Sequence, residues 1–184
     1  MRVLLEHGAD MTARDDTHST PLHLASSKGS PKIVRLFIES GADINTRDGS
    51  DKTPLHSASY RVSAESVQLG LAWANANEQD ERFLAPLRHG GFVERAKTVQ
   101  LLLEHGADVT ARDDTYSTPL HLASSMGSPE IVRLFIEYGA DINARDGSDK
   151  THLHLASSGV SVKTARVLLQ HRADVKEQLL FIIP

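Results

Sequence analysis

The sequence predicts an all-helical protein built from small two-helix units that stack in a row. Three observations support this: a motif that returns at regular intervals, a proline at a fixed place in it, and an apolar segment behind it. The motif reads STPLHLAS at 19–26 and 117–124, with the variants KTPLHSAS at 52–59 and KTHLHLAS at 150–157. Self-similarity at a fixed period is typical of solenoids, in which each unit contacts only its neighbours.

Each unit is expected to begin with a short helix. Thr20 suits the N-cap, because its hydroxyl can accept a hydrogen bond from an N–H of the first turn. Pro21 takes the first helical position, where no backbone donor is lost. Leu22 and Leu24 supply an apolar face, and Gly29 ends the helix and turns the chain.

A second helix is expected to start at Pro31 and to end at Gly41. The run from Ile33 to Ile38 makes it apolar on most of its circumference, so it must be covered on several sides. A helix pair of this size cannot bury its own apolar surface. Stacking on the neighbouring units supplies the missing contacts.

The motif proline measures the period of the array. It falls at Pro21, Pro54 and Pro119, with His152 in the same place of the last copy. The successive separations are therefore 33, 65 and 33, and the first of them is one period. The middle gap, almost twice as long, predicts a further copy near residue 86. Pro86 stands there, in LAPLRHGG.

The surroundings of Pro86 keep the same spacing. Thr98 stands twelve residues after it, as Ile131 stands twelve residues after the proline of its own copy. We therefore interpret residues 66–98 as a degenerate stretch of repeat. The alternative is that residues 70–95 are foreign sequence inserted into the array.

A longer duplication is also visible, since residues 4–45 return almost unchanged at 102–143. Gly90 and Gly91 weaken the copy around Pro86 by about 1–2 kcal/mol relative to alanine, which predicts disorder or a distorted first helix there. The predicted organisation is one domain over 1–184, with a partial repeat at 1–17, repeats at 18–50, 51–82, 83–115 (degenerate), 116–148 and 149–175, and a tail at 176–184.

These motifs resemble the ankyrin repeat family over residues 2 to 175. The shared pattern is Thr-Pro-Leu-His-x-Ala, a turn with glycine, an apolar helix, and then Gly-Ala-Asp-x-Asn. The resemblance implies an ankyrin-repeat solenoid of stacked helix-turn-helix units with hairpin-like loops. It also implies that ligands lie against the loop tips and the inner faces of the first helices.

Composition narrows the class of function. The chain has 184 residues, of which 40% are hydrophobic and 24% charged, and a net charge of -4. Nothing in this balance indicates the basic face that nucleic acid requires. There is no cysteine, so disulfides and thiolate chemistry are excluded. No apolar run reaches the ~18 residues of a membrane span, and we expect an intracellular protein, cytoplasmic or nuclear.

The chemistry-bearing side chains do not indicate an enzyme. His23, His56, His121 and His154 recur once per unit, but stacked helices lie ~8–10 Å apart, too far to share a metal ion at bonds of ~2 Å. We expect each to tie a loop to a helix. The acidic residues fall in exposed loops, and neither a nucleophile elbow nor a phosphate-binding loop is present. We predict no metal, cofactor or catalytic residue.

The candidate binding residues are the variable positions of the loop tips and of the ends of the first helices. Tyrosine, arginine and methionine among them are residue types that anchor protein interfaces. The set comprises Asp16, Thr17, Ser19, Lys28, Ser50, Lys52, Tyr60, Arg61, Asp114, Thr115, Tyr116, Ser117, Met126, Ser148 and Lys150.

The leading interpretation is a non-catalytic scaffold that binds a partner protein or peptide, with a slight preference for a basic one. One alternative is an array fragment of a larger multidomain protein, which positions an effector domain. Another is an enzyme or small-molecule binder with a pocket at 83–95. Both ends of the chain are apolar, at 3–5 and in LLFIIP at 179–184. Exposed apolar ends would favour self-association; we favour a tail that folds back as a lid.

Overall fold

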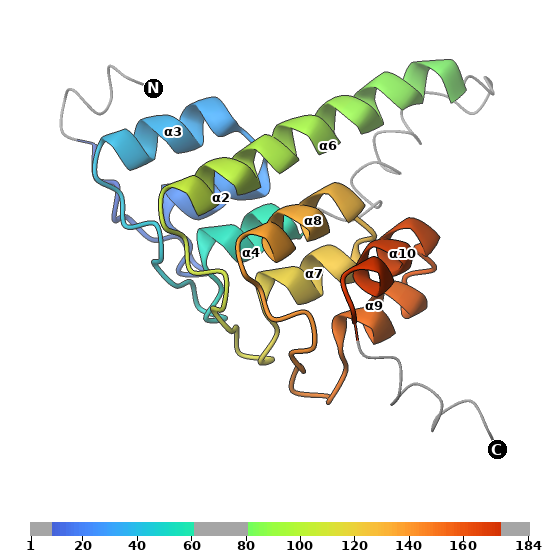
Figure 1. The fold of residues 1–184 in the computed structure, drawn as a ribbon. Helices are drawn as coiled ribbons and strands as arrows, with labels where there is room; N and C mark the ends of the chain where they lie inside the picture. The colour runs from blue at the N-terminus through green and yellow to red at the C-terminus, as the bar shows by residue number, and fades with distance from the viewer. Residues whose placement is uncertain (1–8, 61–80, 174–184) are drawn as a thin grey trace.

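A computed structural model describes residues 9–60 and 81–173, and the side chains of all of these except residues 81–92. The described part contains helices and loops and no strand (Figure 1). The helices are α2 (Pro21–Ser27), α3 (Pro31–Glu39), α4 (Pro54–Ser59), α6 (Glu81–Glu104), α7 (Pro119–Ser125), α8 (Pro129–Glu137), α9 (His152–Ser158) and α10 (Val162–Gln170).

These helices stand in two parallel rows. The first row is α2, α4, α7 and α9, and each of these contacts the next. The second row is α3, α6, α8 and α10, again in contact one with the next. Each first-row helix also packs on a second-row helix, and long loops hang below both rows (Figure 1). This arrangement confirms an all-α solenoid of stacked layers.

The core runs through the stack as a repeated set of aliphatic contacts. Leu22, Leu55, Leu120 and Leu153 occupy the same place in successive first-row helices, and none is more than 3% exposed. Burying one such side chain stabilises the fold by about 1.5–3 kcal/mol. Since the first-row helices that carry these leucines contact one another in sequence, each layer buries apolar surface of its neighbours.

Helix α6 departs from the predicted organisation. Residues 83–115 were expected to contain two helices joined by a turn, but the backbone is helical without a break from Glu81 to Glu104. The neighbours also differ, because α4 contacts α7 directly and α6 contacts α3, α4 and α8. In the view of Figure 1 the N-terminal part of α6 projects past the second row.

The C-terminal part of α6 therefore serves as the second helix of the layer that α4 begins. Thr98, Val99 and Leu102 are completely buried. They stand one period before Ile131, Val132 and Phe135, which fill the same places in α8.

Hydrogen bonds between neighbouring layers give the length of the extra chain. His23 Nε2 lies 2.9 Å from the carbonyl oxygen of Lys52, a separation of 29 residues. His56 Nε2 lies 3.1 Å from the carbonyl oxygen of Ser117, a separation of 61 residues. The second separation is therefore longer than the first by almost one period. One layer thus consists of residues 51–60 and 93–115, with residues 61–92 inserted between its two helices.

In the described part of the chain no layer stands between α4 and α7, which contact each other directly. The predicted repeat boundaries and the alternative of foreign sequence at 70–95 both stay predictions. Residues 83–92 lack the groups that could hold such a layer, since Ala85 and Arg88 replace the threonine and histidine of the motif. The predicted helices within 1–8 and after Ser66, and the tail after Ala173, lie outside the described residues.

Candidate interaction surface at the loop tips

The loop tips are residues 14–19, 47–52, 112–117 and 145–150, which precede the first-row helices. An aspartate organises each turn. Oδ1 of Asp15 accepts hydrogen bonds from the backbone N–H groups of Thr17 and Ser19, both at 2.9 Å. Asp48, Asp113 and Asp146 accept the equivalent pairs in the other tips. The hydrogen bond from the Thr17 hydroxyl lowers the pKa of Asp15, so this carboxylate is ionised at neutral pH.

One residue in each tip adopts a left-handed backbone conformation although it is not glycine. These residues are His18, Asp51, Tyr116 and Asp149, with φ between 59° and 66°. Side chains with a Cβ rarely adopt this region. At Tyr116 the side chain is 64% exposed.

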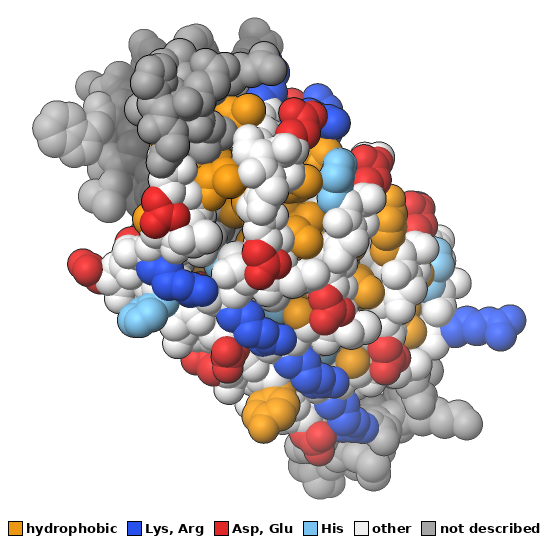
Figure 2. All heavy atoms as spheres, turned by 90° about the vertical axis from the view of Figure 1, so that its left-hand side faces the viewer, with side chains coloured by type: hydrophobic (Ala, Val, Ile, Leu, Met, Phe, Trp, Pro, Cys, Tyr) orange, Lys and Arg blue, Asp and Glu red, His pale blue; other side chains and the backbone are white. Residues whose placement is uncertain are grey.

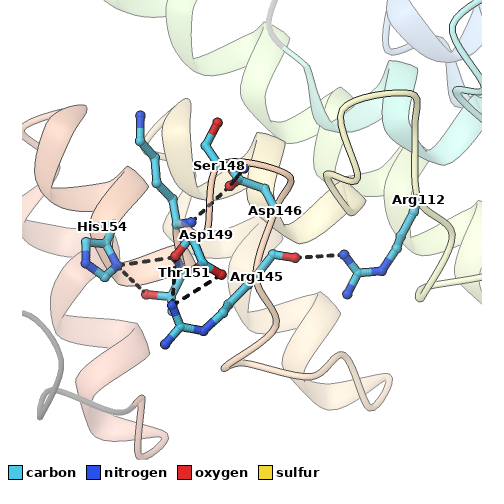
Figure 3. A network of polar contacts seen from close by, with 8 residues as sticks. Arg112, Arg145, Asp146, Ser148, Asp149, Thr151 and His154 are labelled. Atoms are coloured by element: carbon cyan, nitrogen blue, oxygen red, sulfur yellow. Dashed lines mark hydrogen bonds and ion pairs between the residues drawn. The ribbon is translucent and has the colours of Figure 1, made fainter.

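A ladder of arginines joins successive tips. Arg14 Nη1 donates to the carbonyl oxygen of Arg47 at 2.6 Å. Arg47 Nη1 donates to that of Arg112, and Arg112 Nη1 to that of Arg145, both at 2.7 Å. Each Nη1 also donates to the left-handed residue of its own tip. Figure 2 shows basic side chains in a diagonal row across this face, and Figure 3 shows the last step of the ladder.

The ladder was not foreseen, although a signal for it exists. Arg14, Arg47, Arg112 and Arg145 recur with the separations 33, 65 and 33 that the motif proline shows. A search for any residue type that recurs at these separations would have identified the four arginines.

Threonine–histidine pairs fix the tips to the helices behind them. The backbone N–H of Thr53 donates to His56 Nδ1 at 3.1 Å, so the proton of this ring is on Nε2. Nε2 then donates to the carbonyl oxygen of Ser117 in the next tip. Burial lowers the pKa of His23 and of His56, and both rings are neutral. The predicted structural role of these histidines is confirmed.

The predicted binding residues fall into three groups by exposure. Exposed are Asp16, Thr17, Lys28, Tyr60, Asp114, Thr115, Tyr116, Ser148 and Lys150; half-buried are Ser19, Ser50, Lys52 and Met126; Ser117 is buried. Arg61 lies outside the described residues. Lys28, Tyr60 and Met126 are the C-caps of α2, α4 and α7. The candidate surface therefore extends from the tips to the opposite ends of the first-row helices.

Ser117 differs from its assignment as a binding residue. It is 8% exposed. Its N–H donates to Asp113 and its carbonyl oxygen accepts from His56, so its groups hold the loop together.

The described residues were also compared with the requirements of metal binding and of a membrane span. Among them, no three or more histidine, aspartate or glutamate side chains gather where a metal ion could be held. No helix in the described part of the chain is long and apolar enough to cross a membrane.

Comparison with known proteins agrees with this geometry. The family model described as "Ankyrin repeats (3 copies)" matches residues 1–80 and 91–178. The unmatched stretch 81–90 falls in the N-terminal part of α6, within the insertion. No curated protein sequence gives a significant match. Ankyrin repeats are generally protein–protein interaction modules and are typically not enzymes. Because this family model matches most of the chain, the protein belongs to the ankyrin repeat family.

Proposed function

We propose that this protein is a non-catalytic scaffold that binds a partner protein or peptide on its loop tips and on the exposed side of its first-row helices. The observation that carries this proposal is the row of loop tips itself. Aspartate turns and the arginine ladder hold the tips in place, while most of the variable side chains are exposed.

Preorganisation favours binding by such a surface. The N–H groups of Thr17, Ser19, Thr115 and Ser117 are already bonded to aspartate oxygens. The turns therefore need little ordering when a partner arrives, which removes part of the entropic cost of association. Recognition is left to the side chains.

Two tyrosines are the strongest anchors. Tyr116 is 64% exposed at a tip, and Tyr60 is 47% exposed at the C-cap of α4. Helices α4 and α7 are in contact, so the two rings belong to adjacent layers. Tyr60 lies at the C-terminal end of α4 and Tyr116 precedes the N-terminal end of α7. Tyrosine supplies a large apolar area and a hydroxyl, and it is enriched among residues that dominate binding energy.

The charges of the tips favour a basic partner. Asp16, Asp51 and Asp114 are exposed, and no arginine of the ladder contacts their carboxylates. The Nη1 groups of Arg14, Arg47 and Arg112 donate to backbone carbonyls, and Arg145 Nη1 also lies 3.6 Å from Asp149 Oδ1. A partner with lysine or arginine would meet carboxylates that are available for ion pairs.

The test is quantitative affinity capture from native extract with three single variants. Tyr60→Ala and Tyr116→Ala should each lower recovery of the specific partner. Tyr138→Ala is the matched control, because Tyr138 is 40% exposed but caps α8 in the second row. Equal recovery of every captured protein by all three variants would contradict the proposal. The alternative of a pocket at 83–95 depends mainly on side chains outside the described residues and stays a prediction.

A further inference from the structure

The last described layer, α9 with α10, leaves an apolar face open among the described residues. Val160 is 84% exposed, Val162 69% and Leu169 47%. Beside them a hollow of about 640 Å³ lies between the two helices, with Ala156 and Ala165 in its wall. Elsewhere in the second row each helix packs on the one before it, α6 on α3, α8 on α6 and α10 on α8. The α9–α10 face, formed by these five residues, is therefore of the kind that accepts a helix in the earlier layers.

The edge of this face is basic. Lys163 and Arg166 are exposed on α10, and Arg166 also lines the hollow. Residues 151–173 contain no aspartate or glutamate, although the whole chain has a net charge of -4. An apolar face beside a cationic edge suits a helix whose apolar side chains are flanked by carboxylates.

The same basic edge occurs on α3, where the structure describes the helix that packs on it. Lys32 and Arg35 hold the positions that correspond to the two basic residues of α10. They line one side of a groove whose other side is formed by α6, with Glu94 and Glu104. Lys97 of α6 lines the same groove and pairs with Glu94 at 2.8 Å. Helix α6 thus brings more negative than positive charge to this edge.

Charges also alternate along the later helices of the second row. Lys97 of α6, Glu130 of α8 and Lys163 of α10 stand one period apart, so each of these helices meets the opposite sign on the next. Opposite charges on neighbouring surfaces favour their association and penalise a partner of the wrong sign. A helix that continued this row beyond α10 would accordingly carry carboxylates opposite Lys163.

A further repeat of the same kind does not fit this face. A Cβ added to Gly127 would lie 2.9 Å from Ser161 Cβ, at the start of the next second-row helix. A Cβ added to Gly29 would lie 3.3 Å from Arg95 Cα of α6. Val160 stands one period after Gly127, so its side chain fills the space that the following repeat would need. The geometry favours a single helix over another layer.

We propose that the α9–α10 face binds an acidic amphipathic helix of a partner protein. Apolar side chains of this helix enter the hollow beside Val162 and Leu169, and its carboxylates lie along the edge formed by Lys163 and Arg166. This is the helix-in-groove mode of recognition. The face lies on the last layer and not on the loop tips, so this proposal does not depend on the function proposed for the tips.

A pair of synthetic peptides tests the proposal. Both are labelled helix formers of about 18 residues, built on alanine with leucine along one face. The first carries glutamate on both edges of that face, and the second carries lysine there. In fluorescence anisotropy with the full chain, we expect the glutamate peptide to bind at least about tenfold more tightly than the lysine peptide. Equal binding of the two peptides, or no binding of the glutamate peptide, would overturn the proposal.

Substitutions locate the binding on this face. Arg166→Glu should weaken the glutamate peptide at least about threefold and strengthen the lysine peptide. Arg133→Glu is the matched control, because Arg133 is exposed at the same position one period earlier, on α8, where α10 already packs. Leu169→Ser should weaken both peptides, whereas Tyr116→Ala, at a loop tip, should weaken neither. Equal effects of Arg166→Glu and Arg133→Glu would contradict the placement.

Two other occupants would give different results. A second copy of the chain would produce a dimer in sedimentation equilibrium without peptide, and Leu169→Ser would dissociate it. An anionic membrane surface would bind the chain as vesicles of phosphatidylcholine with phosphatidylserine, and Arg166→Glu would release it. Either result, with no binding of the glutamate peptide, would assign the face to that occupant and overturn the proposal. Circular dichroism and urea midpoints verify that the variants are folded.

Discussion

The imidazole rings of His121 and His152 lie against each other where α7 meets α9, with centroids 3.9 Å apart and planes tilted by 43°. Thr118 N–H donates to His121 Nδ1 at 3.1 Å, so His121 carries its proton on Nε2. His152 Nδ1 lies 2.8 Å from the carbonyl oxygen of Ile142, so His152 carries its proton on Nδ1. Both Nε2 atoms are buried without a hydrogen-bond partner. Burial lowers the pKa of His121, so this ring too is neutral.

This pair should make the fold sensitive to acid. Burial, and next the neighbouring His121, lower the pKa of His152 from 6.5 to about 3. Between pH 6.5 and about pH 3, the unfolded chain therefore binds a proton at His152 that the folded chain does not bind. Stability contributed by the neutral ring is complete above pH 6.5 and falls as the pH drops towards 3, with a slope of up to about 1.4 kcal/mol per pH unit for this group. Urea unfolding at a series of pH values measures it.

The variant His152→Pro distinguishes the contribution of His152 to the acid response from that of the other histidines. His152 stands where the other copies of the motif carry proline at the first helical position. His152→Pro removes the buried titratable group, so the loss of stability below pH 6.5 should be shallower by about one proton. His105→Gln, at an exposed site, is the control and should keep the parent's slope. An unchanged slope in His152→Pro would show that the pair does not govern the acid response.

Removing residues 61–92 should leave the array folded. The deletion joins Tyr60 to Val93. The layer formed by α4 and the C-terminal part of α6 then has the same length as the other layers. The junction already has a contact across it, since Arg95 Nη1 donates to the carbonyl oxygen of Tyr60 at 2.6 Å. Shortening the connection lowers its closure entropy cost, by about 0.6 kcal/mol for each halving of length. Circular dichroism and urea unfolding should show a cooperative fold with fewer helical residues. A chain that no longer folds would show that the insertion contributes a necessary layer.

Breaking one step of the arginine ladder should weaken the coupling between two tips. Arg112→Lys keeps the charge but cannot bond the carbonyls of Tyr116 and Arg145 with the same planar group. We expect a loss of about 1–2 kcal/mol in the free energy of unfolding. Arg133→Ala, on the exposed side of α8, should change it by less than about 0.5 kcal/mol. Equal effects of the two substitutions on the urea midpoint would mean that the ladder adds nothing to stability.

Alanine substitutions at two glycines distinguish the stability cost of backbone strain from the cost of a steric clash between layers. Gly139 has φ of 83° and open space where a Cβ would stand, so Gly139→Ala should cost only the left-handed strain, about 1–2 kcal/mol. Gly127 has φ of 66°, and its Cβ would meet Ser161 at 2.9 Å. Gly127→Ala should therefore lower the thermal midpoint more than Gly139→Ala does. The reverse order would argue against tight packing between α8's layer and α10's.

The local sequence determined where the first-row helices begin and how they are tied to their loops. The pair Thr20–Pro21 predicts the start of α2, and the same two residue types stand at the start of α4 and α7. The threonine–histidine contact lies within a single turn, so it could be predicted from the motif alone. These features depend on neighbours a few residues apart, which the spacing of the letters reveals.

Only the tertiary structure decided which second helix completes the layer of α4. Spacing alone placed a hidden repeat around Pro86, because Thr98 keeps the twelve-residue distance from it. In the fold, the layers present similar apolar faces, so a helix almost one period further along the chain can take the place of a nearer one. Burial of Val99 and Leu102 and the bond from His56 to Ser117 stabilise that choice. Periodicity records how units were copied, whereas contacts between residues far apart in the sequence, such as that of His56 with Ser117, determine which helices share a layer.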